Sequence, residues 1–177
     1  MKKRKVVKVV KAVKLEKKQE RVGDGPAVEV KKFFRDVDLP EYALDSDVGF
    51  DIRANESVTL CPFDQKPIRT GIAMKIPEGH VGLIRDRVGM ITKMGVHTAA
   101  GTFDPAYRGE VSIILINFGD ETVQIEKGMS IAQMIVLPVK KVKIKEVKQL
   151  PITERYDRSF GSTGMKNVIK QLNDLTK

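Results

Sequence analysis

Residues 110–125 read EVSIILINFGDETVQI, and this stretch decides the fold class. An apolar run covers residues 110–117, the turn signal Phe-Gly-Asp follows at 118–120, and a second apolar run covers residues 122–125. Short apolar runs that are separated by turn residues are typical of β-strands. The stretch therefore predicts two strands joined by a tight turn.

The same alternation of short apolar runs and turns continues on both sides of this stretch. Val28 and Val30 mark the first run, and turn signals at 77–79 and 127–128 separate later ones. The other predicted strands cover residues 49–54, 57–61, 72–76, 81–85, 131–139 and 141–147. We therefore expect an all-β fold, a jelly-roll-like β-barrel or sandwich, rather than alternating β/α units.

Helical periodicity is confined to two short segments. At most one short internal helix is expected, within residues 88–94. After Gly164, Val168, Ile169, Leu172 and Leu175 recur at helical spacing, which predicts a short C-terminal helix. The length of 177 residues suits one domain with tails.

The net charge of +9 is concentrated at the amino-terminal end. Residues 1–21 contain ten Lys or Arg against Glu16 and Glu20, so the rest of the chain is close to neutral. Such a basic arm can attract nucleic acid or another anionic partner. A solvated extension is the simpler interpretation, and we assign the arm no specific role.

Composition also argues against a membrane protein and a disulfide-rich protein. No apolar run reaches the roughly 18 residues of a membrane-spanning helix, because Gln133 and Pro138 interrupt the closest one, at residues 131–139. The single Cys61 can form neither an intrachain disulfide nor a CxxC metal motif. We therefore expect no membrane partner and a cytoplasmic location.

Three segments carry residues that suit chemistry. The first, Gly101-Thr-Phe-Asp104-Pro-Ala-Tyr107-Arg-Gly109, brackets a carboxylate, an aromatic ring and a cation with glycines, although alone it would be an ordinary turn. The second, Phe160-Gly-Ser-Thr-Gly164, has the small residues and hydroxyls that can wrap phosphate oxygens, or is a flexible tail. In the third, Gln133 lies within an apolar strand, where a buried amide needs a partner or a ligand.

Together with Val48-Gly-Phe-Asp51-Ile-Arg-Ala54 and Arg85-Asp-Arg87-Val-Gly-Met90, these segments have the order and spacing of five motifs. The set resembles the trimeric dUTPase family over roughly residues 28–164. The resemblance implies a β jelly roll, a homotrimer in which each active site takes residues from all three chains, and dUTP as the substrate. The implied reaction releases dUMP and pyrophosphate, which limits uracil incorporation into DNA and supplies dUMP for dTMP synthesis.

The resemblance assigns catalysis to Asp104, which would orient and partly deprotonate a water that attacks the α-phosphorus. An ordinary aspartate, with a pKa of about 3.9, is ionised at neutral pH and can accept this proton. The implied cofactor is Mg²⁺, held by the substrate phosphates and by no protein ligand. We therefore expect His80 and His97 to be ordinary surface or strand residues.

The resemblance also assigns substrate binding to eight residues. Tyr107 would pack on the deoxyribose and exclude a 2′-hydroxyl, and backbone groups of a hairpin that begins near Thr98 would read uracil. Asp51 would organise the site without taking part in the chemical step. The full substrate-binding set is Arg87, Thr98, Tyr107, Gln133, Arg155, Phe160, Ser162 and Thr163.

Three departures from the family pattern bear on activity. Val88 replaces a serine whose hydroxyl would contact the triphosphate, and a methyl group cannot replace that hydrogen bond. Met129 and Ser130 stand where the family has Asp and Arg. Tyr156, Arg158 and Ser159 stand in glycine positions of the fifth motif, which predicts a stiffer arm.

Three alternatives remain at this point. A dCTP deaminase shares the jelly roll, but it needs a carboxylate in the strand after the third motif, where this chain has Ile114. A dUTPase-like binding or regulatory protein would hold nucleotide, or an anionic partner through the basic arm, without turnover. A capsid-like structural jelly roll would leave the ordered polar residues as coincidence.

Four segments are expected along the chain. Gly23, Gly25 and Pro26 end a basic extension at residues 1–26. Residues 27–150 form the β domain. The resemblance makes residues 151–164 an arm that closes over the active site, and residues 165–177 form a C-terminal amphipathic extension.

Overall fold

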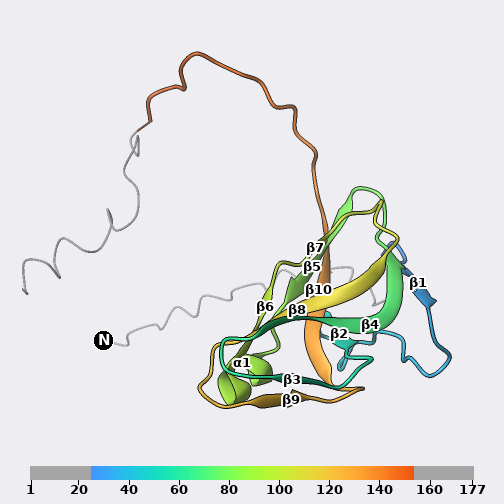
Figure 1. Cartoon of the computed structure of the whole chain (residues 1–177). Coiled ribbons are helices and arrows are strands. Elements are labelled where there is room, and N and C mark those ends of the chain that lie inside the picture. Colours follow the sequence, from blue (N-terminus) through green and yellow to red (C-terminus); the bar gives the residue numbers. More distant parts are fainter. Residues whose placement is uncertain (1–24, 154–177) are drawn as a thin grey trace, which may run out of the picture. The chain divides into compact units, whose positions relative to one another are not determined.

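The structure is a computed structural model in which residues 25–153 are described (Figure 1). The chain divides into two compact units, residues 1–140 and 141–177. Within the described range, every strand and the one helix belong to the first unit. They are β1 (Glu29–Lys32), β2 (Phe50–Arg53), β3 (Val58–Leu60), β4 (Gln65–Lys75), β5 (His80–Arg85), α1 (Val88–Met94), β6 (Val96–Ala99), β7 (Thr102–Phe103), β8 (Glu110–Asn117), β9 (Val123–Ile125) and β10 (Ser130–Pro138).

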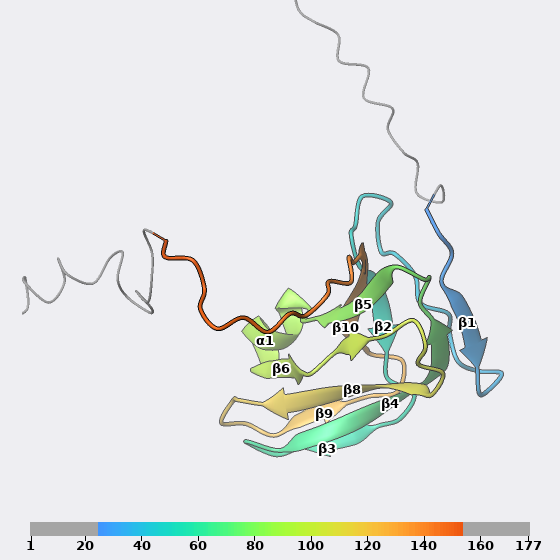
Figure 2. The ribbon, with the colours of Figure 1, turned by 90° about the horizontal axis from the view of Figure 1, so that it is seen from above.

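The strands form two four-stranded sheets and one two-stranded sheet, all of them antiparallel. The first sheet has the order β1-β4-β8-β6, the second has the order β2-β10-β5-β7, and β3 pairs with β9. The view from above in Figure 2 shows β4 and β8 in one layer and β2, β5 and β10 in another. The expectation of an all-β sandwich or barrel is confirmed.

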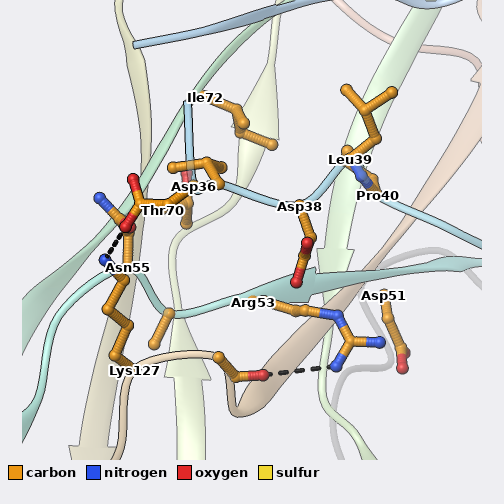
Figure 3. Close-up of a pocket in the computed structure, with 13 residues that line it drawn as sticks. Asp36, Asp38, Leu39, Pro40, Asp51, Arg53, Asn55, Thr70, Ile72 and Lys127 are labelled. Atoms are coloured by element: carbon orange, nitrogen blue, oxygen red, sulfur yellow. Dashed lines mark hydrogen bonds and ion pairs between the residues drawn. The ribbon is translucent and has the colours of Figure 1, made fainter. Parts of the chain in front are cut away.

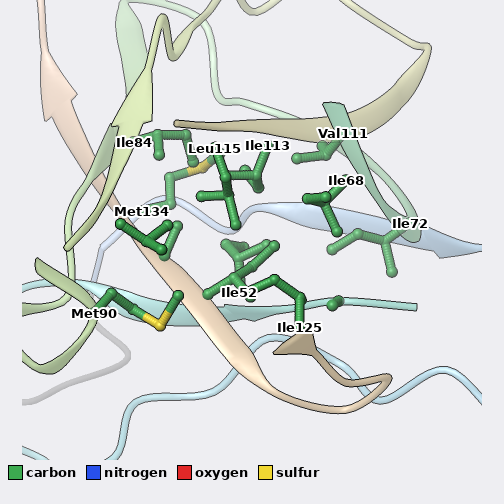
Figure 4. Close-up of a cluster of buried hydrophobic side chains, with 14 of the residues drawn as sticks. Ile52, Ile68, Ile72, Ile84, Met90, Val111, Ile113, Leu115, Ile125 and Met134 are labelled. Carbon is green, nitrogen blue, oxygen red and sulfur yellow. The ribbon is translucent and has the colours of Figure 1, made fainter. Parts of the chain in front are cut away.

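The core lies between these layers because one side of each strand is apolar. On β8, Val111, Ile113 and Leu115 are at most 1% exposed, while the alternating residues are only half buried. Figure 4 shows them facing Ile52 and Met134 of the second sheet. Burying each such side chain stabilises the fold by about 1.5–3 kcal/mol, so the alternation also fixes which faces of β2 and β10 point outward.

Several predicted elements are confirmed and one is wrong. The helix begins at Val88 and ends where Gly95 adopts a left-handed conformation, with φ of 66°. The strand predicted at residues 141–147 is absent: Val142 is 79% exposed and Ile144 is 99% exposed. A strand needs a neighbouring strand for its backbone hydrogen bonds, and residues 141–147 have no such partner within the described chain. The C-terminal helix predicted after Gly164 lies outside the described residues.

Across residues 25–153, no helix has the length and apolar character that crossing a membrane requires.

Candidate active site

Two strands of the second sheet project polar side chains from the face opposite the core. Gln133 of β10 pairs with Asp51 of β2 on one side and with Arg85 of β5 on the other. Residues that lie directly opposite each other in an antiparallel pair share a face. Because Ile52 and Met134 point into the core, Asp51 and Gln133 must face outward.

Arg87 follows β5 and lies beside this row. Its Nε atom is 3.3 Å from Oδ1 of Asp51, and its guanidinium also donates to the carbonyl oxygen of Ser130 at 3.3 Å. The Asp51 side chain is only 14% exposed, whereas Arg87 is 38% exposed. A half-exposed pair adds little stability, so its main consequence is orientation: Asp51 holds one edge of the guanidinium and leaves the rest accessible.

The row borders a cavity of about 550 Å³. Asp51, Arg87 and Gln133 line it together with Lys93, whose side chain adds a second cation to the wall. Val88, 73% exposed, presents a methyl surface to the same cavity. Planar guanidinium and point-like ammonium groups are the usual ligands of phosphate oxygens, so the cavity suits a polyphosphate.

The side-chain amide of Gln133 has the hydrogen-bond partner that an amide within an apolar strand is expected to need. Its Nε2 atom donates to the carbonyl oxygen of Asp86 at 2.9 Å. A β-carbon added to Gly49 would lie 2.9 Å from Oε1 of Gln133, so only glycine leaves the amide this position. The amide is therefore held at the cavity wall by the backbone on one side and by close packing on the other.

A second group of predicted site residues lies on the chain from β6 to β8. Thr98 of β6 lies opposite Leu115 of β8. Its backbone N–H and its hydroxyl both donate to Oδ1 of Asp86, each at 2.7 Å. Burial alone would raise the pKa of the Asp86 carboxyl, but the hydrogen bonds from Thr98 and His97 hold that pKa below its ordinary value.

Asp104 and Tyr107 occupy the tight turn between β7 and β8. The Tyr107 N–H donates to the Asp104 carbonyl at 3.1 Å, and the Tyr107 hydroxyl donates to the Glu110 carbonyl at 3.0 Å. Gly109 has no room for a side chain, because a β-carbon there would lie 2.4 Å from the Tyr107 hydroxyl oxygen. The tyrosine ring is thus fixed, while the Asp104 carboxylate is exposed and forms no hydrogen bond or ion pair with any described residue.

Comparison with known proteins identifies the family. The family described as dUTPase matches residues 35–164. The chain belongs to the dUTPase family. Deoxyuridine 5'-triphosphate nucleotidohydrolases of Hydrogenobaculum and Clostridium tetani are 46% and 44% identical to it, each covering 77% of this chain and 97% and 96% of the relative.

Solved dUTPase structures have the same fold. A Staphylococcus bacteriophage 80alpha dUTPase variant with dUpNHpp matches with a TM-score of 0.74 and 29% identity, covering 79% of this chain and 99% of that one. A variant of the phage phi11 dUTPase from S. aureus, described with a structural Mg(II) ion, matches with a TM-score of 0.66 and 26% identity over 71% and 99%.

A smaller cavity lies beside the hairpin that joins β6 to β8. It has a volume of about 170 Å³ and is bordered by Ala99, Gly101 and Phe103 on one side and by Ser112 and Ile114 on the other. None of the described residues that line it is titratable. Ile114, the residue at the position where we expect a deaminase to need a carboxylate, is part of this uncharged wall.

Strand register separates the two groups of site residues within one chain. Phe103 pairs with Gly82, so Asp104 comes next opposite Val81 near the start of β5, whereas Arg87 lies two residues beyond the end of β5. An extended chain from Val81 to Arg87 spans about 20 Å. The register therefore places the backbones of Asp104 and Arg87 of one dUTPase chain far apart along β5.

A different cavity, of about 240 Å³, lies behind Asp51 (Figure 3). Both of its cations are already paired: Lys127 binds Asp36 at 2.6 Å, and Arg53 donates to the Gly128 carbonyl at 3.3 Å. We assign this cavity no part in the chemistry. It marks where the chain at residues 36–40 packs on the sheets.

The remaining predicted residues divide in two. Arg155, Phe160, Ser162 and Thr163 lie outside the described residues, as do the fifth-motif departures. The fourth-motif departures are described: Met129 packs against the core, and Ser130 lines the cavity beside Arg87. The sequence analysis missed Asp86 and Lys93, because a charged residue beside Arg87 or on a short helix has no distinctive pattern.

Proposed function

We propose that this chain hydrolyses dUTP to dUMP and pyrophosphate, which limits uracil incorporation into DNA and supplies dUMP for dTMP synthesis. Membership of the dUTPase family and similarity to named nucleotidohydrolases support the reaction. The single observation that carries it is that the chain supplies both a cationic cavity at Arg87 and, elsewhere on its surface, an exposed carboxylate at Asp104 with no partner among the described residues. These are the two parts that phosphoryl hydrolysis requires.

In the proposed mechanism, Asp104 accepts a proton from a water molecule as the water oxygen bonds to the α-phosphorus. The bond between the α-phosphorus and the oxygen that bridges to the β-phosphorus breaks, and its electron pair leaves with pyrophosphate. Arg87 and Gln133 hold phosphate oxygens, and Arg87 offsets the negative charge that otherwise repels Asp104. Asp51 keeps Arg87 oriented throughout.

Base and sugar recognition are assigned to the hairpin. The Tyr107 ring lies against the deoxyribose, where a 2′-hydroxyl would not fit, and backbone groups from Thr98 onward read uracil. The fixed tyrosine hydroxyl and the close approach of Gly109 support this role for the ring. Arg155, Phe160, Ser162 and Thr163 complete the proposed site from the arm at residues 151–164, with Phe160 stacking on the base.

Mg²⁺ is the proposed cofactor, bound through substrate phosphates. Within residues 25–153, no three His, Cys, Asp or Glu side chains gather as a metal site would require. Donors on the phosphates therefore fit the residues present better than a protein cage. When bound, the ion neutralises phosphate charge and polarises the phosphoryl oxygens.

The exposed free thiol of Cys61 suits a reducing compartment, which supports the cytoplasm as the proposed location.

The basic extension at residues 1–26, whose charge could attract nucleic acid, has no proposed role in turnover.

A nucleotide panel tests the proposed function. With Mg²⁺ present, we expect pyrophosphate release from dUTP and much slower release from dTTP, dCTP and UTP, and no ammonia from dCTP. Ammonia release would support the deaminase alternative. Tight dUTP binding without pyrophosphate would support a binding protein, for which the methyl surface of Val88 in the cavity is the specific observation.

We propose a homotrimer with shared active sites, because the register keeps Asp104 and Arg87 of one chain apart. Subunit mixing tests this arrangement with two inactive variants, Asp104→Asn and Arg87→Leu. Mixed trimers assembled at equal amounts should regain about a quarter of wild-type activity, since each site draws the two residues from different chains at random. The variants are mixed by unfolding them together and letting the trimers reassemble. As the control, each variant alone is unfolded and reassembled in the same way. Sites contained within one chain would regain nothing.

A further inference from the structure

Asp86 contacts both groups of site residues, the one at Gln133 and the one on the chain from β6 to β8. Neither the sequence analysis nor the proposed function assigns it a role. It lies between β5 and α1, immediately before Arg87. Its Oδ1 atom accepts three hydrogen bonds, from the Thr98 N–H, the Thr98 hydroxyl and Nδ1 of His97, each at 2.7 Å. Its carbonyl oxygen accepts the Gln133 amide at 2.9 Å.

The sheet topology explains why this carboxylate is needed. β6 is the edge strand of the first sheet and has a neighbour, β8, on one side only. The Thr98 N–H points away from β8, so no strand accepts it. Asp86 belongs to the chain that leaves β5 of the second sheet. Its carboxylate therefore takes the place of a missing strand and ties the edge of one sheet to the other.

The position of this tie matters for the hairpin. Thr98 lies two residues before the left-handed residue Ala100, with φ of 60°, and Gly101, with φ of 136°. A β-carbon on Gly101 would lie 2.6 Å from the Ile84 β-carbon, so the turn packs directly on β5. Thr98 is thus held by β8 on one side and by Asp86 on the other, just before the turn whose backbone is proposed to read the base.

We propose that Asp86 is a positioning residue for base recognition. Its carboxylate fixes the position of the hairpin at Thr98 relative to β5, while its carbonyl oxygen holds the phosphate-facing amide of Gln133. This inference rests on the proposed function and deepens it by naming what fixes the base-binding backbone. Asp86 itself contacts no substrate. It acts on uracil selection through Thr98, and on phosphate binding only through its backbone, which a side-chain substitution leaves in place.

The test compares dUTP with dCTP in Asp86→Ala and Asp86→Asn. In Asp86→Ala, we expect kcat/KM for dUTP to fall about tenfold and the preference for dUTP over dCTP to narrow about tenfold, because a charged acceptor of several hydrogen bonds is lost. Asp86→Asn keeps Oδ1 as an acceptor for both Thr98 donors, so it should stay within about threefold of wild type. The matched control is Asp120→Ala, an exposed carboxylate at the turn between β8 and β9.

The ratio of kcat/KM for dUTP to kcat/KM for dCTP distinguishes a positioning role of Asp86 from a purely structural role. Loss of folded protein lowers turnover of both nucleotides equally, so an unchanged ratio in Asp86→Ala would overturn the inference. The same variants are also titrated with dUMP and dCMP by calorimetry, which needs no turnover. If wild type releases no pyrophosphate, the proposed function fails, and a binding preference for dUMP that narrows in Asp86→Ala still supports the positioning role. An unchanged binding preference overturns it.

Discussion

Asp104→Asn should lower kcat for dUTP by about 10²- to 10⁴-fold, the usual contribution of a positioned general base. An amide has the same shape as the carboxylate but cannot accept the proton of the attacking water. The exposed Asp104 side chain has no partner among the described residues, so its replacement breaks no contact there. Steady-state pyrophosphate release measures the loss, and calorimetric titration with a non-hydrolysable dUTP analogue should show that binding persists.

Asp120→Asn is the control for this substitution, because Asp120 is also an exposed aspartate and lies at a different turn, between β8 and β9. It should leave kcat unchanged. Denaturant unfolding of both variants should match wild type, which separates lost chemistry from lost folding. Turnover retained in Asp104→Asn would remove Asp104 from the role of general base.

Arg87→Leu should lower kcat/KM for dUTP by about 10²-fold or more, because it acts twice on the same cavity. It removes the guanidinium that would bind phosphate, and it leaves the Asp51 carboxylate, only 14% exposed, without its partner at the wall. An unpaired carboxylate repels the triphosphate. Arg87→Lys keeps the charge but cannot contact both Asp51 and the Ser130 carbonyl in the present geometry, so an intermediate loss is expected.

A double-mutant cycle distinguishes orientation from direct binding at this pair. If Asp51 acts only by orienting Arg87, Asp51→Asn should cost little once Arg87 is leucine, and the double variant should recover part of the loss by removing the repelling charge. Additive losses in kcat/KM would instead show that Asp51 contributes independently of Arg87. Unfolding measurements on all three variants check that the pair is not mainly structural.

Local sequence patterns were sufficient for the fold class and for most of the strands. β8 at residues 110–117 has its expected bounds because a strand with one buried face must alternate, and α1 ends where Gly95 can adopt a left-handed conformation. β6 and β7 were not predicted as strands, because β6 buries only Val96 and β7 has only two residues, so neither shows an alternating apolar pattern. Residues 141–147 have a composition typical of a strand, but they form none, because no described strand pairs with them.

Much of the candidate site could also be expected from the sequence, since the resemblance of its motifs to those of the dUTPase family assigns roles to Asp104, Tyr107, Arg87 and Gln133. What those residues form together was decided by tertiary structure. Strand register places Asp51 and Gln133 side by side near Arg87, beyond the end of β5. It places Asp104 near the start of β5. The role inferred for Asp86 depends on the contact between the edges of two sheets. Periodicity determines which way a side chain faces, but only pairing between strands distant in sequence determines which side chains meet, because each pairing depends on a partner that the local sequence does not specify.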